Sequence, residues 1–513
     1  MRKHPSAVNK IDFYKTGHIF QYEPGTQFVY SNLTARSAKH SPMLRNVPTA
    51  AFQDEIVVVG LQMFVQDRLI DDWNETFFSV SKDQAVGAYR RRMDTSLGKG
   101  AISVDHIAAL HDLGHLPLRI KALPEGERCS IRVPFMTFQN TDPNFFWITN
   151  YLEDIYSVGL WKIITTATIA YGNRNIAEHY AEKTGTPKAF VPFQFHDFSL
   201  RGMSTDDDAA YNGVGHLSSF VGTDTVPAID MVEAFYFDNA EATLIGASVP
   251  ATEHSVMCVA GPDAEIETYR RLIVDVYPRG VVSIVSDTWD FWRVITQISS
   301  ALKDQILARQ PDDLGMAKVV FRPDSGDPYK IIVGDPDAPA GTPAAKGAVQ
   351  CLWDIFGGTV TSTGHRQLDS HVGLIYGDSI TIELADRILA GLAANGFASG
   401  NIVFGVGSYT YQGITRDSLG MAVKATWSMV NGQPREMFKD PITDSGEKKS
   451  ACGLVRVEKV DGRYVMFDRQ TVEQEQRGCL LPLFENGRLL RLTSFQAIRE
   501  RLWSDFYGLG SGQ

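Results

Sequence analysis

Four short apolar runs, each ending in a polar or glycine-rich tip, constrain the fold of this chain more than any other feature. Uninterrupted runs of this length are typical of strands buried on both faces, as in a parallel sheet. Helices are predicted after two of them, at residues 289–309 and 380–395, the second capped by Ser379. Strand, polar tip and helix in repetition indicate an α/β sheet or barrel. The four runs cover residues 281–287, 318–326, 372–378 and 402–408.

The polar tips of these runs predict a common site. In an α/β barrel the carboxyl ends of the strands meet at one mouth, and the active site lies there. We therefore expect Asp287, Arg322, Asp324, Asp378 and the glycine loop 405–408 to converge, although they are far apart in the sequence. Taken singly, each is equally compatible with an ordinary acid or glycine of a surface turn.

The repetition covers only part of the chain. Residues 156–409 carry it, and we expect them to form an irregular α/β barrel. Residues 1–155 and 410–513 mix helical and strand-like patterns. We expect these two terminal segments to pack together as an additional mixed α+β domain beside the barrel.

Composition excludes several classes of protein. The net charge of −11 argues against a general nucleic-acid binder and against a protein held on acidic lipid. The longest apolar run, near residues 56–65, is far shorter than the ~20 residues of a membrane helix, and no signal peptide is recognisable. Five scattered cysteines without a CxxC pair fit a reducing compartment. We expect a cytoplasmic protein that binds neither nucleic acid nor membrane.

Two motifs suggest phosphate and sugar chemistry. In Arg322-Pro323-Asp324-Ser325-Gly326, the guanidinium is a forked donor suited to phosphate, and the Asp324 carboxylate is an acceptor suited to sugar hydroxyls. A surface salt bridge beside a turn is the alternative interpretation. A lone histidine such as His254 is usually structural, but a carboxylate partner such as Asp287 would suit it to proton transfer or to attack on phosphorus.

Phe198 and Arg201 form a further candidate pair. An aromatic face with a nearby guanidinium can hold a flat heteroaromatic ring and bind its carbonyl oxygen. A core phenylalanine beside a surface arginine is the alternative.

Together with their order along the chain, these segments resemble the nicotinate/nicotinamide phosphoribosyltransferase family. The resemblance covers nearly the whole chain, and the joint match is far more specific than any single motif. The matching segments are residues 12–15, 124–126, 140–143, 196–198, 222–225, 248–255, 285–287, 322–326, 377–378, 415–417 and 438–441. The family's phosphate loop is usually richer in glycine than residues 404–409 are, because Ser408 adds a side chain there.

The resemblance implies transfer of phosphoribose from phosphoribosyl pyrophosphate to nicotinamide, giving nicotinamide mononucleotide and pyrophosphate. It also implies a type II phosphoribosyltransferase barrel and a homodimer with active sites at the subunit interface. The implied nicotinamide pocket consists of Phe198, Arg201, Asp224 and Tyr14 of the partner chain. The implied ribose and phosphate residues are Arg322, Asp324, Gly377, Asp378, Gly407, Ser408, Arg416, Lys424 and Lys439.

The resemblance further implies that ATP hydrolysis is coupled to the reaction through a phosphorylated histidine, which maps to His254 with Asp287 as its partner. The implied catalytic residues are thus His254, Asp287 and Asp324. Because the departing pyrophosphate is highly charged, we expect Mg²⁺ as a cofactor, with no ligand set assigned.

Three rival functions stand beside this interpretation. A nicotinate phosphoribosyltransferase shares the fold and reaction, but the Asp224 carboxylate favours an amide over a carboxylate substrate. A non-catalytic binding or signalling relative is disfavoured because His254, Arg322, Asp324 and Arg416 are all present. A sugar-phosphate aldolase or isomerase would need a Schiff-base lysine or a catalytic base at a strand end, and no lysine is so placed.

Overall fold

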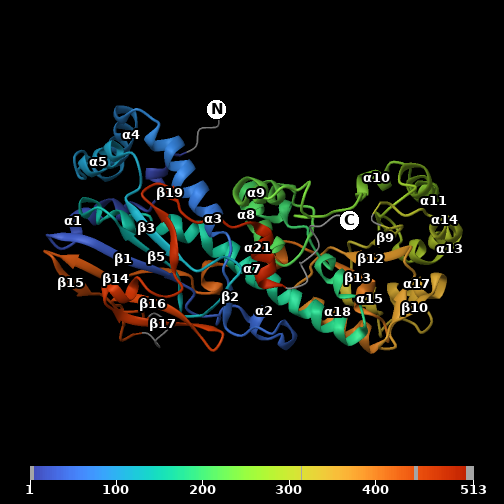
Figure 1. The fold of residues 1–513 in the computed structure, drawn as a ribbon. Coiled ribbons are helices and arrows are strands. Elements are labelled where there is room, and N and C mark those ends of the chain that lie inside the picture. The colour runs from blue at the N-terminus through green and yellow to red at the C-terminus, as the bar shows by residue number, and fades with distance from the viewer. Residues whose placement is uncertain (1–4, 314, 444–448, 504–513) are drawn as a thin grey trace.

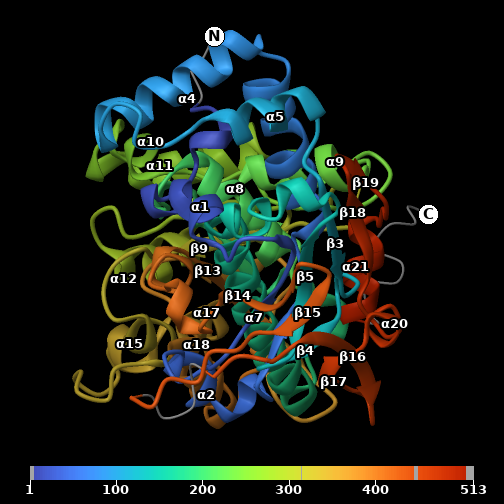
Figure 2. The ribbon, with the colours of Figure 1, turned by 90° about the vertical axis from the view of Figure 1, so that its left-hand side faces the viewer.

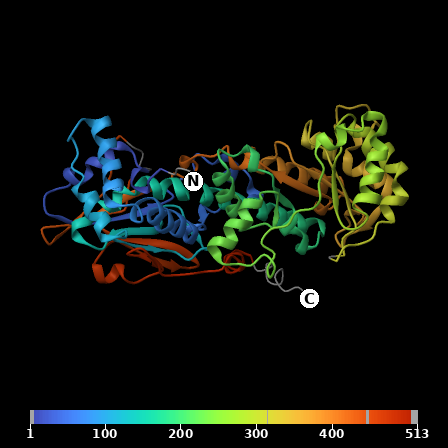
Figure 3. The same ribbon diagram turned by 90° about the horizontal axis from the view of Figure 1, so that it is seen from above.

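The computed structural model describes residues 5–313, 315–443 and 449–503. Figure 1 shows two regions at opposite ends of an elongated molecule, and Figure 3 shows the same separation from above. The 32-residue helix α7 (Glu153–Thr184) runs between them. Figure 2 views the molecule from the end that carries the antiparallel sheet.

One of the two regions, which we call the barrel region, carries β9, β12 and β13 in Figure 1. It contains a six-stranded parallel sheet with the order β7-β6-β13-β12-β9-β8. Its last four strands along the chain are those that the apolar runs predict. Helices follow the strands because a parallel connection needs a crossover that covers one face of the sheet. The bounds are β6 (Phe195–Asp197), β7 (Gly222–Thr223), β8 (Val282–Val285), β9 (Val319–Arg322), β12 (Val372–Tyr376) and β13 (Ile402–Val406).

Residues 247–252 close this sheet into an irregular barrel. Ala247 forms a parallel bridge with Gly222 of β7, and Ala251 forms one with Ser283 of β8. One irregular segment therefore joins the two edge strands. The predicted fold class, an irregular α/β barrel, is confirmed.

The helices of the barrel region differ in detail from the prediction. The predicted helix at 380–395 begins later, because Thr381 and not Ser379 is its N-cap, and the Thr381 hydroxyl accepts from Leu384 N. The predicted helix at 289–309 is shorter, because helical residues begin at Phe291 and end at Leu307, with a π-helical turn at Val294–Ile298 and a break at Leu302. The principal helices are α8 (Asp206–Leu217), α9 (Val226–Tyr236), α11 (Glu265–Arg270), α12 (Phe291–Arg293), α13 (Ser299–Ala301), α14 (Lys303–Leu307), α15 (Pro328–Val333), α17 (Ala348–Phe356) and α18 (Ile382–Ala394).

The second region is built around an antiparallel sheet with the order β15-β14-β1-β5-β3-β18-β19. Three N-terminal strands form the centre of this sheet and two C-terminal strands lie on each side of them, so both ends of the chain are needed to complete the sheet. This confirms the mixed α+β unit made from both termini, whereas its exact boundaries stay a prediction. The bounds are β1 (Thr26–Thr34), β3 (Leu118–Ala122), β5 (Pro134–Asn140), β14 (Ala422–Val430), β15 (Gln433–Glu436), β18 (Leu481–Glu485) and β19 (Arg488–Leu489).

Smaller elements complete the second region. The predicted strands near 454–460 and 464–467 pair as an antiparallel hairpin. Helices α4 and α5 pack at one end of the region (Figure 1). The bounds are β2 (Glu55–Val57), β4 (Arg128–Ser130), β16 (Leu454–Val460), β17 (Arg463–Gln470), α1 (His18–Gln21), α2 (Pro42–Arg45), α4 (Lys82–Leu97), α5 (Asp105–Leu113) and α20 (Val472–Glu475).

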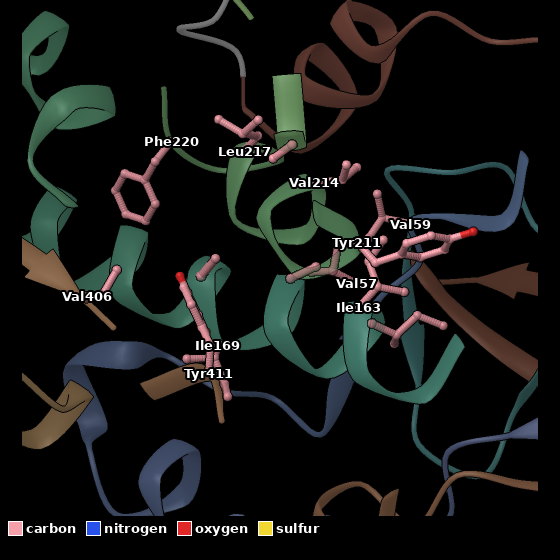
Figure 4. Close-up of a cluster of buried hydrophobic side chains, with 14 of the residues drawn as sticks. Val57, Val59, Ile163, Ile169, Tyr211, Val214, Leu217, Phe220, Val406 and Tyr411 are labelled. Atoms are coloured by element: carbon pink, nitrogen blue, oxygen red, sulfur yellow. The ribbon is translucent and has the colours of Figure 1, made fainter. Parts of the chain in front are cut away.

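One hydrophobic core is continuous between the two regions. In Figure 4, Ile163 and Ile169 of α7 lie among side chains from α8, from Val57 of β2 and from Val406 of β13. The C-terminal helix α21 (Phe495–Leu502) adds a buried polar clamp, because the Arg499 guanidinium donates to backbone carbonyls on both sides of β7. Burial of this core therefore fixes the barrel against the sheet region.

Candidate active site

The predicted site residues gather at the carboxyl edge of the barrel. Parallel strands end at the same edge, so the residue that follows each strand faces the same mouth. The residues that end or follow the strands there are Phe198 after β6, Asp224 after β7, Asp287 after β8, Arg322 at the end of β9, Gly377 after β12 and Gly407 after β13.

His254 and Asp287 form a pair at this mouth. His254 begins the short helix α10 (His254–Cys258), and its Nε2 lies 3.2 Å from Asp287 Oδ1. The other carboxylate oxygen, Oδ2, accepts from Asp324 N at 3.0 Å and from the Ser325 hydroxyl at 2.5 Å. The Asp287 side chain is 6% exposed and the His254 side chain 47% exposed. A fixed carboxylate thus orients an accessible imidazole, as proton transfer or phosphoryl transfer to the ring requires.

Arg322, at the end of β9, has one buried donor without a partner among the described residues. Its guanidinium donates to Thr252 O, which ties β9 to the segment that closes the barrel. Its buried Nε has no hydrogen-bond partner among the described residues. Because buried donors are almost always paired, this one suits an anionic ligand such as phosphate.

The turn after Arg322 is anchored from β12. The Tyr376 hydroxyl donates to Ser325 O at 2.9 Å and to Gly326 O at 3.1 Å. Gly326 adopts a positive φ of 92°, which only glycine adopts without strain. The turn thereby holds Asp324 at the rim. Asp378 follows β12 and is exposed, with one oxygen accepting from the Ser379 hydroxyl at 2.7 Å.

The Phe198 ring lies directly on two glycines. A Cβ added at Gly405 would lie 2.2 Å from Phe198 Cδ2, and one added at Gly377 would lie 2.8 Å from the same atom. The backbone also fixes this residue, because Phe198 N donates to Val406 O at 2.8 Å. The two glycines therefore form the seat of a flat, half-buried aromatic platform at the mouth.

Arg201 and Ser408 lie on two loops that touch. Arg201 is exposed on the turn after Phe198, at Leu200–Gly202. A Cβ added at Gly202 would lie 2.7 Å from Ser408 Cβ, so the loops after β6 and β13 pack together. Ser408 begins the short helix α19 (Ser408–Tyr411) directly after Gly407. The Ser408 side chain therefore packs against the loop that carries Arg201.

Asp224 is held by two donors, one of which, His196, has its ring centroid 5.0 Å from that of Phe198. His196 Nε2 lies 2.9 Å from Asp224 Oδ1, and the Ser248 hydroxyl donates to the same oxygen at 2.6 Å. Burial by itself would raise the pKa of Asp224. The hydrogen bond and charge of His196, the Ser248 hydroxyl and the Arg322 guanidinium outweigh burial and hold the pKa below its usual value. The group is thus a carboxylate with Oδ2 left to accept from a ligand.

The remaining predicted residues lie on the antiparallel-sheet region and not at the mouth. We call them the sheet-face group: Tyr14, Arg416, Lys424 and Lys439. Tyr14 lies in the turn Phe13–Gly17 and is 59% exposed, and Lys424 lies in β14. Arg416 and Lys439 are exposed. Within the described residues, no hydrogen bond or ion pair joins this group to the mouth residues named above.

Sequence reasoning assigned no role to His196, Ser248 or Tyr376. Each acts on a predicted residue through a contact that depends on strand register. His196 and Asp224, for example, meet because Gly222 lies beside His196 in the sheet. The only available signal was their position next to a predicted residue or strand end.

No preformed metal cage is present in the part of the chain that the structure describes, since no group of three or more His, Cys, Asp or Glu side chains there has the geometry to hold a metal. None of the described helices has the length and apolar character needed to cross a bilayer.

An α/β barrel whose mouth combines an aromatic platform, rim carboxylates and an unpaired guanidinium donor suits an enzyme acting on a planar ring and a phosphorylated sugar. A solved structure supports the fold. A nicotinate-nucleotide pyrophosphorylase from Pyrococcus furiosus matches with a TM-score of 0.57 and 13% identity, over 100% of this chain and 99% of that chain.

Sequence comparisons establish the family. The model of the nicotinate phosphoribosyltransferase (NAPRTase) family matches residues 193–475, more than half of the chain. A nicotinamide phosphoribosyltransferase from Acinetobacter baylyi is 58% identical over 97% of each chain. One from Xanthomonas campestris is 30% identical over 95% of this chain and 96% of that relative. The chain belongs to the nicotinate phosphoribosyltransferase family and is a pentosyltransferase.

Proposed function

We propose that this enzyme joins nicotinamide to phosphoribosyl pyrophosphate and releases nicotinamide mononucleotide and pyrophosphate. The names of the two similar relatives support the choice of nicotinamide. The observation that carries it is Asp224, a carboxylate with a lowered pKa that His196 links to the Phe198 platform. Oδ1 accepts from His196 and Ser248, so Oδ2 is left to accept from a substrate N–H.

Charge discriminates the amide from the acid at this position. The NH₂ group of nicotinamide donates to a carboxylate, whereas the carboxylate of nicotinate would face a like charge without an intervening proton. Arg201 would donate to the amide oxygen, and Phe198 would stack on one face of the ring. Tyr14 from the partner subunit would cover the other face. The pyridine nitrogen is itself the nucleophile, so these contacts serve to orient it and no general base is needed.

The sugar and its leaving group would occupy the rim. Asp324 and Asp378 would accept from ribose hydroxyls, with Gly377 allowing close approach. Phosphate groups would be bound by Arg322, Gly407, Ser408, Arg416, Lys424 and Lys439. The unpaired Nε of Arg322 supports this assignment. Guanidinium and ammonium donors stabilise the charge that grows on pyrophosphate as the anomeric C–O bond breaks.

We expect Mg²⁺ to accompany the pyrophosphate. Exposed aspartates such as Asp378 are oxygen ligands of the kind that Mg²⁺ accepts together with substrate phosphates and water. Such a site needs only one or two protein carboxylates. The described residues contain no cage of three or more metal-binding side chains. When bound, the ion would supply electrostatic stabilisation of the leaving group.

ATP would act through His254. The carboxylate of Asp287 orients the imidazole, and the ring nitrogen that is not held by Asp287 is available as the acceptor of a phosphoryl group. In that step the nitrogen forms a bond to the γ-phosphorus of ATP, the bond to the β,γ-bridging oxygen breaks, and ADP leaves. Hydrolysis of the phosphohistidine would return the free imidazole.

Two subunits would share each active site. The mouth and the sheet-face group have complementary chemistry, and no hydrogen bond or ion pair joins them within the described chain. A homodimer in which the sheet face of one protomer covers the mouth of the other would bring Tyr14 and the phosphate-binding lysines to the barrel. The molecule's elongated shape, with the two regions at opposite ends, suits this arrangement (Figure 3).

A cytoplasmic location is part of the proposal. All five cysteines are unpaired, and three of them are buried. Such thiols are compatible with a reducing compartment.

Mononucleotide formation with nicotinamide and nicotinate side by side, each with and without ATP, tests the proposal. We expect product with nicotinamide, stimulated by ATP, and at least tenfold lower kcat/KM with nicotinate. Preference for nicotinate would keep the reaction and overturn the Asp224 assignment. No product with either substrate would favour a non-catalytic relative.

A further inference from the structure

Glu153, the first residue of α7, contacts two lysines: Lys424 of the sheet-face group and Lys15, the neighbour of Tyr14. Its Oε2 accepts from Lys15 Nζ at 2.7 Å, and its Oε1 lies 3.8 Å from Lys424 Nζ. The neighbouring Asp154 Oδ2 accepts from Asp12 N at 2.9 Å. Two adjacent carboxylates on the first turn of one helix therefore hold both ends of the segment that contains Tyr14. They are well placed there, because the N-terminus of a helix stabilises negative charge.

Lys15 transmits this restraint to the aromatic ring. Its side chain is only 1% exposed, which requires a paired charge. The ammonium lies 5.0 Å from the centroid of the Tyr14 ring, and His18 contacts the ring edge at a centroid distance of 5.4 Å. The position of a largely exposed tyrosine thus depends on a buried lysine that Glu153 fixes.

Lys424 is held more loosely than Lys15. At 3.8 Å from Glu153 it forms no hydrogen bond to that carboxylate, and its ammonium donates instead to Val423 O at 2.7 Å. Burial lowers the pKa of Lys424, Glu153 opposes the shift, and nearby cations including Arg36 and Lys439 add to it. An ammonium in this setting is available to an incoming anion.

We propose that Glu153 is a positioning residue that couples binding of pyrophosphate at Lys424 to the placement of Tyr14 over the nicotinamide ring. The inference rests on the proposed function, because it takes its two ligands from there. Glu153 divides its attraction between two lysines. When the pyrophosphate group draws Lys424 away, the Glu153–Lys15 pair tightens and Tyr14 is fixed. Nicotinamide should therefore bind more tightly when pyrophosphate or phosphoribosyl pyrophosphate is already present, and the reverse must also hold.

Calorimetric titration of nicotinamide with and without inorganic pyrophosphate and Mg²⁺ tests the coupling. For the wild-type enzyme we expect about fivefold tighter nicotinamide binding with pyrophosphate, within the usual range of coupling between sites. In Glu153→Gln the ratio should fall to about one, with a higher KM for nicotinamide and a nearly unchanged kcat. Pyrophosphate alone should bind at least as tightly as to the wild type, because a repelling charge is gone. General damage would instead weaken both ligands.

Two further variants complete the design. Lys15→Met removes the link to Tyr14 and leaves Glu153 beside Lys424, so it should abolish the coupling as well. Glu178→Gln is the matched control, because Glu178 is on the same helix, is similarly exposed and pairs with the buried Arg174 at 3.0 Å. It should keep the wild-type ratio. Equal coupling in Glu153→Gln and wild type, or no coupling in an active wild type, would overturn the inference. A wild-type enzyme that forms no mononucleotide would instead contradict the proposed function.

Discussion

The side chains of the barrel mouth and those of the sheet-face group are held in position in different ways. At the mouth, strand ends place the groups and hydrogen bonds fix several of them; the Asp287 carboxylate, for example, contacts His254, Asp324 and Ser325. On the sheet face, Tyr14 contacts Lys15, which pairs with Glu153 of α7, and Lys424 lies 3.8 Å from the same carboxylate. The difference indicates a division of labour. We propose that the mouth is preorganised for the chemistry, whereas the sheet face would adjust to its ligands.

Removing Arg322 should cause the largest loss, because the mouth depends on preorganised donors. We expect Arg322→Ala to lower kcat/KM for phosphoribosyl pyrophosphate by about 100-fold, which corresponds to loss of roughly 3 kcal/mol from charged hydrogen bonds. Steady-state kinetics at varied phosphoribosyl pyrophosphate measures the effect. An unchanged KM and kcat would remove Arg322 from the phosphate site.

Adding a methyl group at Gly405, against the Phe198 ring, should have the next largest effect. In Gly405→Ala the new methyl meets the Phe198 ring and the Gly377 backbone, and overpacking of this kind costs about 1–3 kcal/mol. We expect KM for nicotinamide to rise by roughly 10-fold to 30-fold. Gly87→Ala is the control, because nothing lies within 4 Å of a Cβ at that helical position. Equal kinetics for the two variants would show that Phe198 does not form the platform.

Replacing the selectivity carboxylate should have a smaller effect on rate and a clear one on preference. We expect Asp224→Ser to reduce the nicotinamide-to-nicotinate ratio of kcat/KM by about 10-fold, equivalent to roughly 1.4 kcal/mol. Parallel assays with the two substrates give the ratio. The same ratio in variant and wild type would count against Asp224 as the determinant.

The smallest effect should come from pH at the sheet face. Burial holds the pKa of Lys424 below the ordinary value of 10.5, so its positive charge is lost at a lower pH than in a free lysine. Pyrophosphate affinity should therefore weaken as pH rises through this lowered pKa, and Lys424→Arg should keep its affinity over the same range. Titrations between neutral and alkaline pH compare the two proteins. Identical profiles would exclude Lys424 as the titrating group.

The same contrast explains what the sequence could predict. Apolar runs with polar tips mark strand ends, so Asp287, Arg322 and Asp378 could be placed at one mouth from pattern alone. The closing segment at 247–252 and the His196–Asp224 contact depend on sheet order and register, which the pattern does not contain. Glu153 was not recognised because its partners, Lys15 and Lys424, lie far from it in sequence. Local sequence patterns thus predicted the residues of the mouth better than the residues that hold them in place.

Mixing two variants that are each impaired in a different region tests most directly whether the two regions act together across a dimer. Arg322→Ala damages the mouth and Tyr14→Ala damages the sheet face, so a mixed dimer contains one intact site. After subunit exchange of equal amounts, half of the dimers are mixed, and we expect about one quarter of wild-type mononucleotide formation from nicotinamide. Activity no higher than the mean of the two separate variants would contradict a site shared between subunits.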